Sequence, residues 1–398
     1  MAFSLPRNSQ RVFSLQREPD ALLCLDALRF ISFTWVASLH SVLFAAEADN
    51  AMQVFRESDY FFSSIILNAV WSVDTFFLIS GLLVSYMFFK VASLSHCKVH
   101  KDPEHASSRR NWILYYVHRW LRLTPAYLLF IGIYVTWTPR MHGAWAIGTA
   151  QNTSYYVERC EDTWWMNVLY IQNFQSMNDM CYSISWFLSV DMQLYWIAPL
   201  FLLAIYYSWK TGFAAVLGGI LLSTAAIVFL TAHFDLPATA FVIKEIGNVD
   251  FVSHIYVKPW TRCIPYLTGI LCGYIIIQVQ KKDIDIRRPK LMELIVCWLL
   301  AIASALTVIF SVYDYARGPV KTLLEHPLWY PLGRLSYCAY LTHWFLLHYL
   351  LNLGDGAVHF VAVSFQYLTI TIPVVFLSSM LALVWTCLVE IPFMSIEG

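Results

Sequence analysis

Long apolar stretches constrain the fold of this chain more than any other feature. About nine of them approach or exceed the roughly 20 residues that a helix needs to cross a bilayer. They lie near residues 22–46, 65–89, 122–137, 184–207, 211–232, 262–279, 291–313, 332–352 and 360–389. Backbone amides in lipid must be satisfied within the segment, so such stretches form helices. The sequence therefore predicts an all-α fold, a polytopic integral membrane helical bundle.

The composition supports this class. Hydrophobic residues make up 59% of the 398 residues and charged residues only 13%, whereas soluble domains carry roughly a quarter charged residues. The 26 basic and 26 acidic residues balance, so no global basic field would recruit nucleic acid. We expect a multi-pass protein of the plasma membrane or endoplasmic reticulum, with membrane lipids and no nucleic acid as partners.

The basic residues predict the orientation. Lys and Arg gather in the N-terminal segment and in segments 90–122 and 281–290, which the positive-inside rule places in the cytoplasm. The acidic segments 47–61 and 138–183 are then expected to face outward. We divide the chain into a cytoplasmic segment 1–20, a membrane domain 21–394 with an outward loop 138–183, and a tail 395–398.

The outward loop carries two features that require a compartment outside the cytosol. Asn152, Thr153 and Ser154 form an acceptor for N-glycosylation. Cys160 and Cys181 are expected to form a disulfide, because that compartment is oxidising. An unused acceptor and two free thiols are the alternatives.

Ionisable residues inside the first predicted span are candidates for function, because a charge in hydrocarbon is costly. They are Asp26, Arg29 and His40. Arg29 and His40 share a helix face but lie ~16 Å apart along the axis. Arg29 should therefore lie at the cytoplasmic end and His40 near the outer end. A snorkelling arginine and an interfacial histidine are the alternative.

Three charged residues of the next two spans extend this set. Asp74 enters the second span at about the level of His40, where its carboxylate could orient the imidazole; alternatively, Asp74 is simply favoured by the helix dipole. Arg119 and Arg122 share one helix face at the level of Arg29. The three guanidinium groups could bind the phosphates of a cytosolic cofactor, or the pair could simply anchor the helix in the cytoplasm.

Other polar residues fall in the later spans, namely Asp191, Gln193, Arg262, Arg334, Tyr340, His343 and Glu390. His343 is either a second catalytic histidine or a packed core residue. The sequence contains no metal-ligand cluster, P-loop or dinucleotide fingerprint. We therefore predict no metal site and no permanently bound cofactor.

Seven segments spread over nearly the whole chain form one pattern. They are CLDALR followed by His40, VDTFFLISGLL, the Arg119-x-x-Arg122 pair, CEDTWWMNVLYIQNF, SWFLSVDMQLY, KPWTRCIPYLTGILCGY and PLGRLSYCAYLTH. This pattern resembles the acyltransferase 3 superfamily, and within it the nose-resistant-to-fluoxetine branch of animal proteins. The resemblance implies transfer of an acyl group from a thioester such as acyl-CoA to a hydroxyl of a lipid, carbohydrate or other small acceptor. For the animal branch it also implies an alternative, uptake or transport of lipids and hydrophobic compounds without acyl transfer.

The resemblance also implies roles for individual residues. The catalytic histidine and arginine of the family correspond to His40 and Arg29, and Arg119 and Arg122 correspond to the pair associated with the acyl donor. We expect acyl-CoA as co-substrate, His40 as general base and Asp74 as its orienting carboxylate. Further candidates for substrate binding are Asp26, Asp191 and His343.

Two departures from the family pattern affect what is expected of the chain. Branch members usually carry a signal peptide, a cysteine-rich extracellular domain and a further apolar segment ahead of the part that MAFSLPRN resembles, so this chain looks N-terminally incomplete. The family also has another span between Tyr315 and Gly318. With nine spans, everything after Asp314 would be inverted relative to the family, which would place the Arg334 end outside.

Overall fold

The computed structural model describes most of the chain. The described residues are 4–15, 22–45, 48–57, 66, 68–97, 109–141, 150–236, 241–242, 245–246, 249–281, 326–354 and 359–396.

Helices dominate the described residues. The α-helices are α1 (Leu5–Phe13), α2 (Cys24–Ala45), α3 (Ala51–Glu57), α5 (Ser72–Cys97), α7 (Arg109–Trp137), α9 (Ala150–Val168), α10 (Trp186–Tyr207), α11 (Trp209–His233), α12 (Val249–Phe251), α13 (Pro259–Gln280), α17 (Trp329–Leu351), α18 (Val363–Gln366), α19 (Ile372–Trp385) and α20 (Ile391–Ile396). The 3₁₀ turns are η1 (Asn68–Trp71), η2 (Thr138–Arg140), η3 (Gln172–Phe174), η4 (Met177–Asp179) and η5 (Ser183–Ser185), and the π-helical turns are η6 (Val252–Tyr256), η8 (Tyr367–Thr371) and η9 (Thr386–Glu390). Strands β1 (Phe241–Val242) and β2 (Glu245–Ile246) form a short antiparallel pair.

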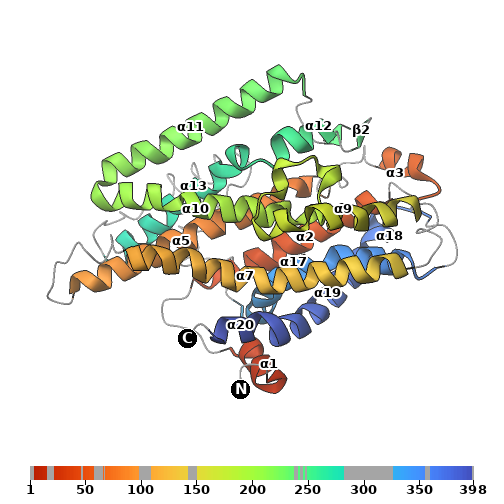
Figure 1. Ribbon diagram of the computed structural model, residues 1–398, viewed down its shortest axis with the longest axis horizontal. Coiled ribbons are helices and arrows are strands. Elements are labelled where there is room, and N and C mark those ends of the chain that lie inside the picture. Colours follow the sequence, from red (N-terminus) through yellow and green to blue (C-terminus); the bar gives the residue numbers. More distant parts are fainter. Residues whose placement is uncertain are drawn as a thin grey trace, which may run out of the picture.

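The predicted all-α membrane fold is confirmed. Within the described residues, six helical segments are long and apolar enough to cross a membrane, and they are Cys24–Ala45, Ala69–Ala92, Ser183–Tyr207, Trp209–His233, Pro259–Gln280 and Val363–Met394. Helix α7 contains the predicted span 122–137 in its second half, and helix α17 overlaps the predicted span 332–352. The predicted span 291–313 lies outside the described residues. The long helices run along the long axis of the molecule, with α11 on one side and α1 on the other (Figure 1).

Helices α5 and α13 pack with their backbones in contact. A Cβ atom added at Gly81 would lie 2.1 Å from the carbonyl oxygen of Tyr266, and one at Gly269 would lie 2.1 Å from that of Leu78. Small residues at such an interface let helices approach closely in a membrane. Since Asp74 faces Arg262 near the start of both helices and Tyr86 bonds Gln280 further along, the two helices run in the same direction.

Helices α2 and α17 also run in the same direction. Near their starts, a Cβ at Gly333 would lie 2.4 Å from Cβ of Asp26. Near their ends, the rings of Phe44 and His348 lie 4.9 Å apart. The start of α17 therefore lies at the same face of the bundle as the start of α2, and Arg334 bonds backbone carbonyls of the N-terminal segment there.

The expectation that the Arg334 end lies outside is therefore wrong. Leu39, in the last part of α2, packs against Val70 of η1, just before α5 begins, so α5 and its parallel neighbour α13 run opposite to α2. Helix α13 consequently ends at the face where α17 begins. That expectation assumed one crossing by the apolar stretch near 291–313, which lies outside the described residues.

This topology predicts that both chain ends lie on one side of the membrane. Helix α19 returns antiparallel to α17, since Thr342 meets Ser378 and Cys338 meets Glu390. An epitope tag after Gly398 and one before Met1 should therefore be equally accessible from the cytosol after selective permeabilisation of the plasma membrane. Accessibility of the C-terminal tag from the opposite side only would contradict this arrangement.

Candidate functional site

A cavity of about 1610 Å³ lies within the described part of the bundle. At the end near α1 it is lined by four arginines, Arg11, Arg29, Arg122 and Arg334. At the other end it is lined by the aromatic rings of Phe76, Phe187 and Tyr340, which pack against one another. We call the end with the four arginines the mouth of the cavity. A cationic mouth and an apolar interior fit a ligand that has an anionic group and an apolar chain.

The arginines of the mouth differ in how far their charge is neutralised. The Arg29 Nη1 donates to Oδ1 of Asp26 at 3.2 Å. Arg334 is occupied by backbone carbonyls. Among the described residues no hydrogen bond or ion pair involves the guanidinium of Arg122, which is exposed at the cavity. Arg122 is therefore better placed than Arg29 or Arg334 to bind an incoming anion.

Arg119 and Asp191 form a salt bridge in the cavity wall. The Arg119 Nη2 also donates to the hydroxyl of Ser80 at 3.2 Å, and its guanidinium lies 4.3 Å from the ring centroid of Tyr195. This pair holds α5, α7 and α10 together at one point. Arg119 and Arg122 were predicted to bind the donor together, but their surroundings differ. Of the two, Arg119 alone has a carboxylate partner among the described residues.

The partner of His40 is His343, on α17. Nδ1 of His40 lies 2.7 Å from Nε2 of His343, and Nδ1 of His343 lies 2.6 Å from the carbonyl oxygen of Tyr340. A carbonyl can only accept, so His343 must carry its proton on Nδ1 when neutral. Its Nε2 then accepts a hydrogen bond from the Nδ1–H of His40. This chain of bonds leaves Nε2 of a neutral His40 unprotonated and able to act as a base.

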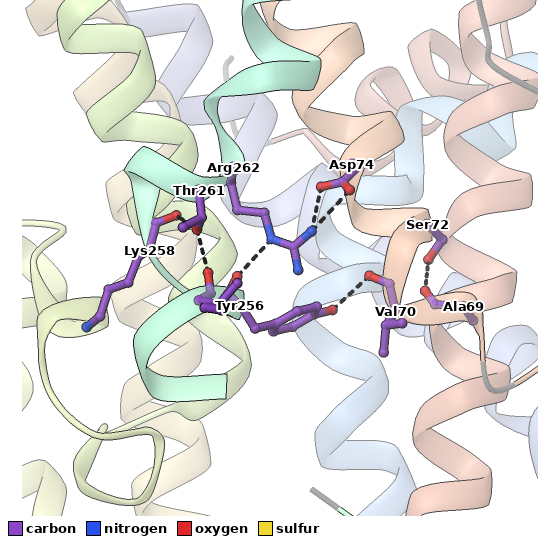
Figure 2. A network of polar contacts seen from close by, with 9 residues as sticks. Ala69, Val70, Ser72, Asp74, Tyr256, Lys258, Thr261 and Arg262 are labelled. Atoms are coloured by element: carbon purple, nitrogen blue, oxygen red, sulfur yellow. Dashed lines mark hydrogen bonds and ion pairs between the residues drawn. The ribbon is translucent and has the colours of Figure 1, made fainter. Parts of the chain in front are cut away.

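The expected contact between Asp74 and His40 is not formed. Both carboxylate oxygens of Asp74 instead lie 3.1 Å from Nη1 of Arg262 on α13 (Figure 2). Nε of Arg262 donates to the carbonyl oxygen of Tyr256 at 2.9 Å, and the guanidinium lies 4.3 Å from the Tyr256 ring centroid. Two residues at the same depth in the membrane need not face each other, because their helices can be rotated differently about their axes. Asp74 faces α13 instead of His40. Arg262 was recognisable in the sequence as a charge inside a span, but its partner was not.

The aromatic end of the cavity separates it from the histidine pair. Tyr340 lines the cavity, and its carbonyl oxygen accepts the hydrogen bond from His343. Neither His40 nor His343 lines the cavity itself. The Tyr340 hydroxyl donates to the carbonyl oxygen of Ile184 at 2.9 Å, which fixes the ring in this position.

The loop 138–183, predicted to face outward, is anchored by a disulfide and a buried polar network. The expected disulfide between Cys160 and Cys181 is present, and Asn152 lies in the first turn of α9. Nζ of Lys258 donates to the carbonyl oxygen of Asn173 at 2.6 Å, and desolvation lowers the pKa of this lysine. Hydropathy did not single out Lys258 and Asn173, since neither falls in a predicted span.

Comparison with known proteins agrees with this architecture. The family model described as "Acyltransferase domain" matches residues 22–332. "Nose resistant to fluoxetine protein 6" of Caenorhabditis elegans is 25% identical over 456 aligned residues, which cover 100% of this chain and 53% of that protein. "Regulator of hypoxia-inducible factor 1" of the same organism is 26% identical over 282 residues, covering 66% of this chain and 52% of that protein.

The chain thus spans about half the length of these curated relatives. No solved structure was found to match it. The family model covers most of the membrane bundle, including Arg29, His40, Arg119 and Arg122. This multi-pass membrane protein therefore belongs to the acyltransferase domain family, acyltransferase 3.

Proposed function

We propose that the chain is a membrane-embedded acyltransferase that moves an acyl group from acyl-CoA to a hydroxyl of a lipid, carbohydrate or other small acceptor. The observation that carries this proposal is the cavity, which has cationic side chains at the predicted cytoplasmic end and aromatic rings next to the histidine pair. Acyl-CoA acts as a co-substrate, and no permanently bound cofactor takes part. The protein acts in the plasma membrane or the endoplasmic reticulum.

The cavity provides the donor site in this proposal. Phosphate oxygens of coenzyme A bind Arg122, with Arg29 next to it, because the planar guanidinium matches phosphate geometry. Asp26 orients Arg29 through their salt bridge. The pantetheine arm extends along the cavity and brings the thioester toward Phe76 and Phe187, next to the histidine pair, and the acyl chain packs on the apolar lining. Arg119 and Asp191 shape the wall of this site rather than neutralise the phosphates.

The histidine pair provides the base. Nε2 of His40 removes the proton of the acceptor hydroxyl as its oxygen attacks the thioester carbonyl. The new C–O bond forms, the C–S bond breaks, and the coenzyme A thiolate receives the proton held by His40. Because Tyr340 lies between the cavity and His343, its hydroxyl must release the carbonyl of Ile184 and its ring must move for donor and acceptor to meet. Asp74 does not contact the imidazole and instead fixes α5 to α13 through Arg262.

The donor site predicts unequal effects of two arginines on one helix. Arg122→Gln should weaken binding of a non-hydrolysable acyl-CoA thioether about tenfold, since a hydrogen bond to a charged group contributes about 1.5 kcal/mol or more. Arg110→Gln is the matched control, because Arg110 lies on α7 but does not line the cavity. Equal affinities of the two variants, measured by calorimetry in nanodiscs, would contradict the donor site.

Transport of a lipid or hydrophobic compound is the second candidate function, because a large, mainly apolar cavity also fits an unmodified lipid. In proteoliposomes a transporter moves a fluorescent lipid without changing it and needs no thioester. An acyltransferase releases coenzyme A only when an acceptor is present. These two readouts separate the alternatives.

A further inference from the structure

Helix α1 is packed on the cationic end of the cavity. Its residues Arg11 and Val12 line the cavity, although the helix lies outside the bundle of long helices (Figure 1). Asn8 and Val12, one turn apart, are buried against the bundle, whereas Arg7 and Arg11 are exposed. Helix α1 is therefore amphipathic, with its buried face toward the protein.

Arg334 holds the C-terminal end of α1. Its Nη1 donates to the carbonyl oxygens of Arg11, Val12 and Ser14, at 2.5, 2.9 and 2.9 Å. The last carbonyls of a helix lack partners within the helix, and a positive charge there is also favoured by the helix dipole. Arg334 satisfies both requirements from a position more than 300 residues away in the sequence.

A second contact fixes the middle of α1. Nδ2 of Asn8 donates to the carbonyl oxygen of Cys387 at 2.9 Å, and both groups are buried. Cys387 lies in the π-helical turn η9, where the regular hydrogen-bonding ladder is interrupted. The position of α1 is thus set by two polar contacts to two different helical segments.

We propose that α1 is part of the ligand site, in which Arg11 joins Arg122 in binding the phosphate groups of the acyl-CoA donor, and that Arg334 is the positioning residue that docks α1 there. The guanidinium of Arg11 forms no hydrogen bond or ion pair with the other described residues, like that of Arg122. Arg334 uses its Nη1 for three carbonyls, so its effect on the anion is indirect. This inference rests on the proposed function for the identity of the ligand.

Binding of the non-hydrolysable thioether analogue of palmitoyl-CoA tests the ligand role. In nanodiscs, Arg11→Gln and Arg334→Gln should each weaken binding by about 3- to 10-fold. Arg7→Gln should bind as the wild type does, because Arg7 is exposed on α1 but does not line the cavity. If Arg7→Gln weakened binding of the analogue as much as Arg11→Gln, the effect would come from general surface charge. That result would overturn the role of Arg11 as a ligand. Wild-type affinity in Arg11→Gln would overturn it as well.

Hydrogen–deuterium exchange of peptides covering residues 5–14 tests the docking role without any ligand. Arg334→Gln should speed exchange in α1 at least tenfold, whereas Arg11→Gln should leave it unchanged. Weakened binding with unchanged exchange in Arg334→Gln would make Arg334 a direct ligand and overturn its positioning role. If the wild type binds no acyl-CoA analogue, the proposed donor and the role of Arg11 both fail, and the exchange result still decides whether Arg334 docks α1.

Discussion

His40→Ala should lower the turnover number by roughly 10²- to 10⁴-fold, which is the usual contribution of a general base. The affinity for acyl-CoA should stay within about twofold of the wild type, because His40 does not line the donor cavity. Steady-state kinetics together with a binding isotherm for the acyl-CoA thioether would check both expectations. His233→Ala is the control, since His233 is an exposed histidine at the end of α11.

The hydrogen bond to His343 adds a sharper test of the same base. His343→Leu removes the acceptor that keeps the proton of His40 on Nδ1, so turnover should fall although His40 is present. His343→Gln retains a carbonyl acceptor of similar reach and should recover part of the loss. Full activity in His343→Leu would show that this bond does not set the tautomer of His40.

Asp191→Ala should cause a large loss of stability. Removal of this carboxylate leaves the partly buried charge of Arg119 without its partner, and loss of one partner of a buried ion pair typically costs about 3–5 kcal/mol. Thermal unfolding in detergent should show a clearly lower Tm. The double variant Arg119→Met/Asp191→Leu should recover much of that loss, because apolar residues of similar volume replace a buried ion pair at little cost.

The same variants separate a structural role of Arg119 from a role in donor binding. The sequence suggested that Arg119 and Arg122 bind the donor together. With Asp191 as its partner, Arg119 should affect stability first, and Arg122 should affect donor affinity first. A native Tm in Arg119→Ala combined with a large loss of acyl-CoA affinity would restore the original expectation.

The spans and their helical structure could be predicted because hydropathy is a local property of the sequence. The candidate residues inside them could also be found, since charged groups are rare in such segments. The direction of α17 could not be predicted, because it depends on the number of crossings between Gln280 and Trp329. The contacts of α17 with α2, at Gly333 and Asp26 near one end and at His348 and Phe44 near the other, show that direction.

The contact partners of the candidate residues could not be predicted from the sequence for a different reason. The depth of Asp74 and of His40 could be estimated from their places along two helices, but the rotation of each helix about its axis could not. Asp74 points to Arg262 and His40 to His343, and each partner lies far away in the chain. The disulfide of Cys160 and Cys181 was predictable because only those two cysteines fall in the outward loop.

Release of coenzyme A by the protein in lipid nanodiscs tests the central claim most directly. The protein is given acyl-CoA with and without a membrane extract as the source of acceptor, and His40→Ala is measured beside the wild type. The proposed mechanism predicts release that requires both the acceptor extract and His40. Normal binding of acyl-CoA without any acceptor-dependent release would contradict acyl transfer and would favour transport.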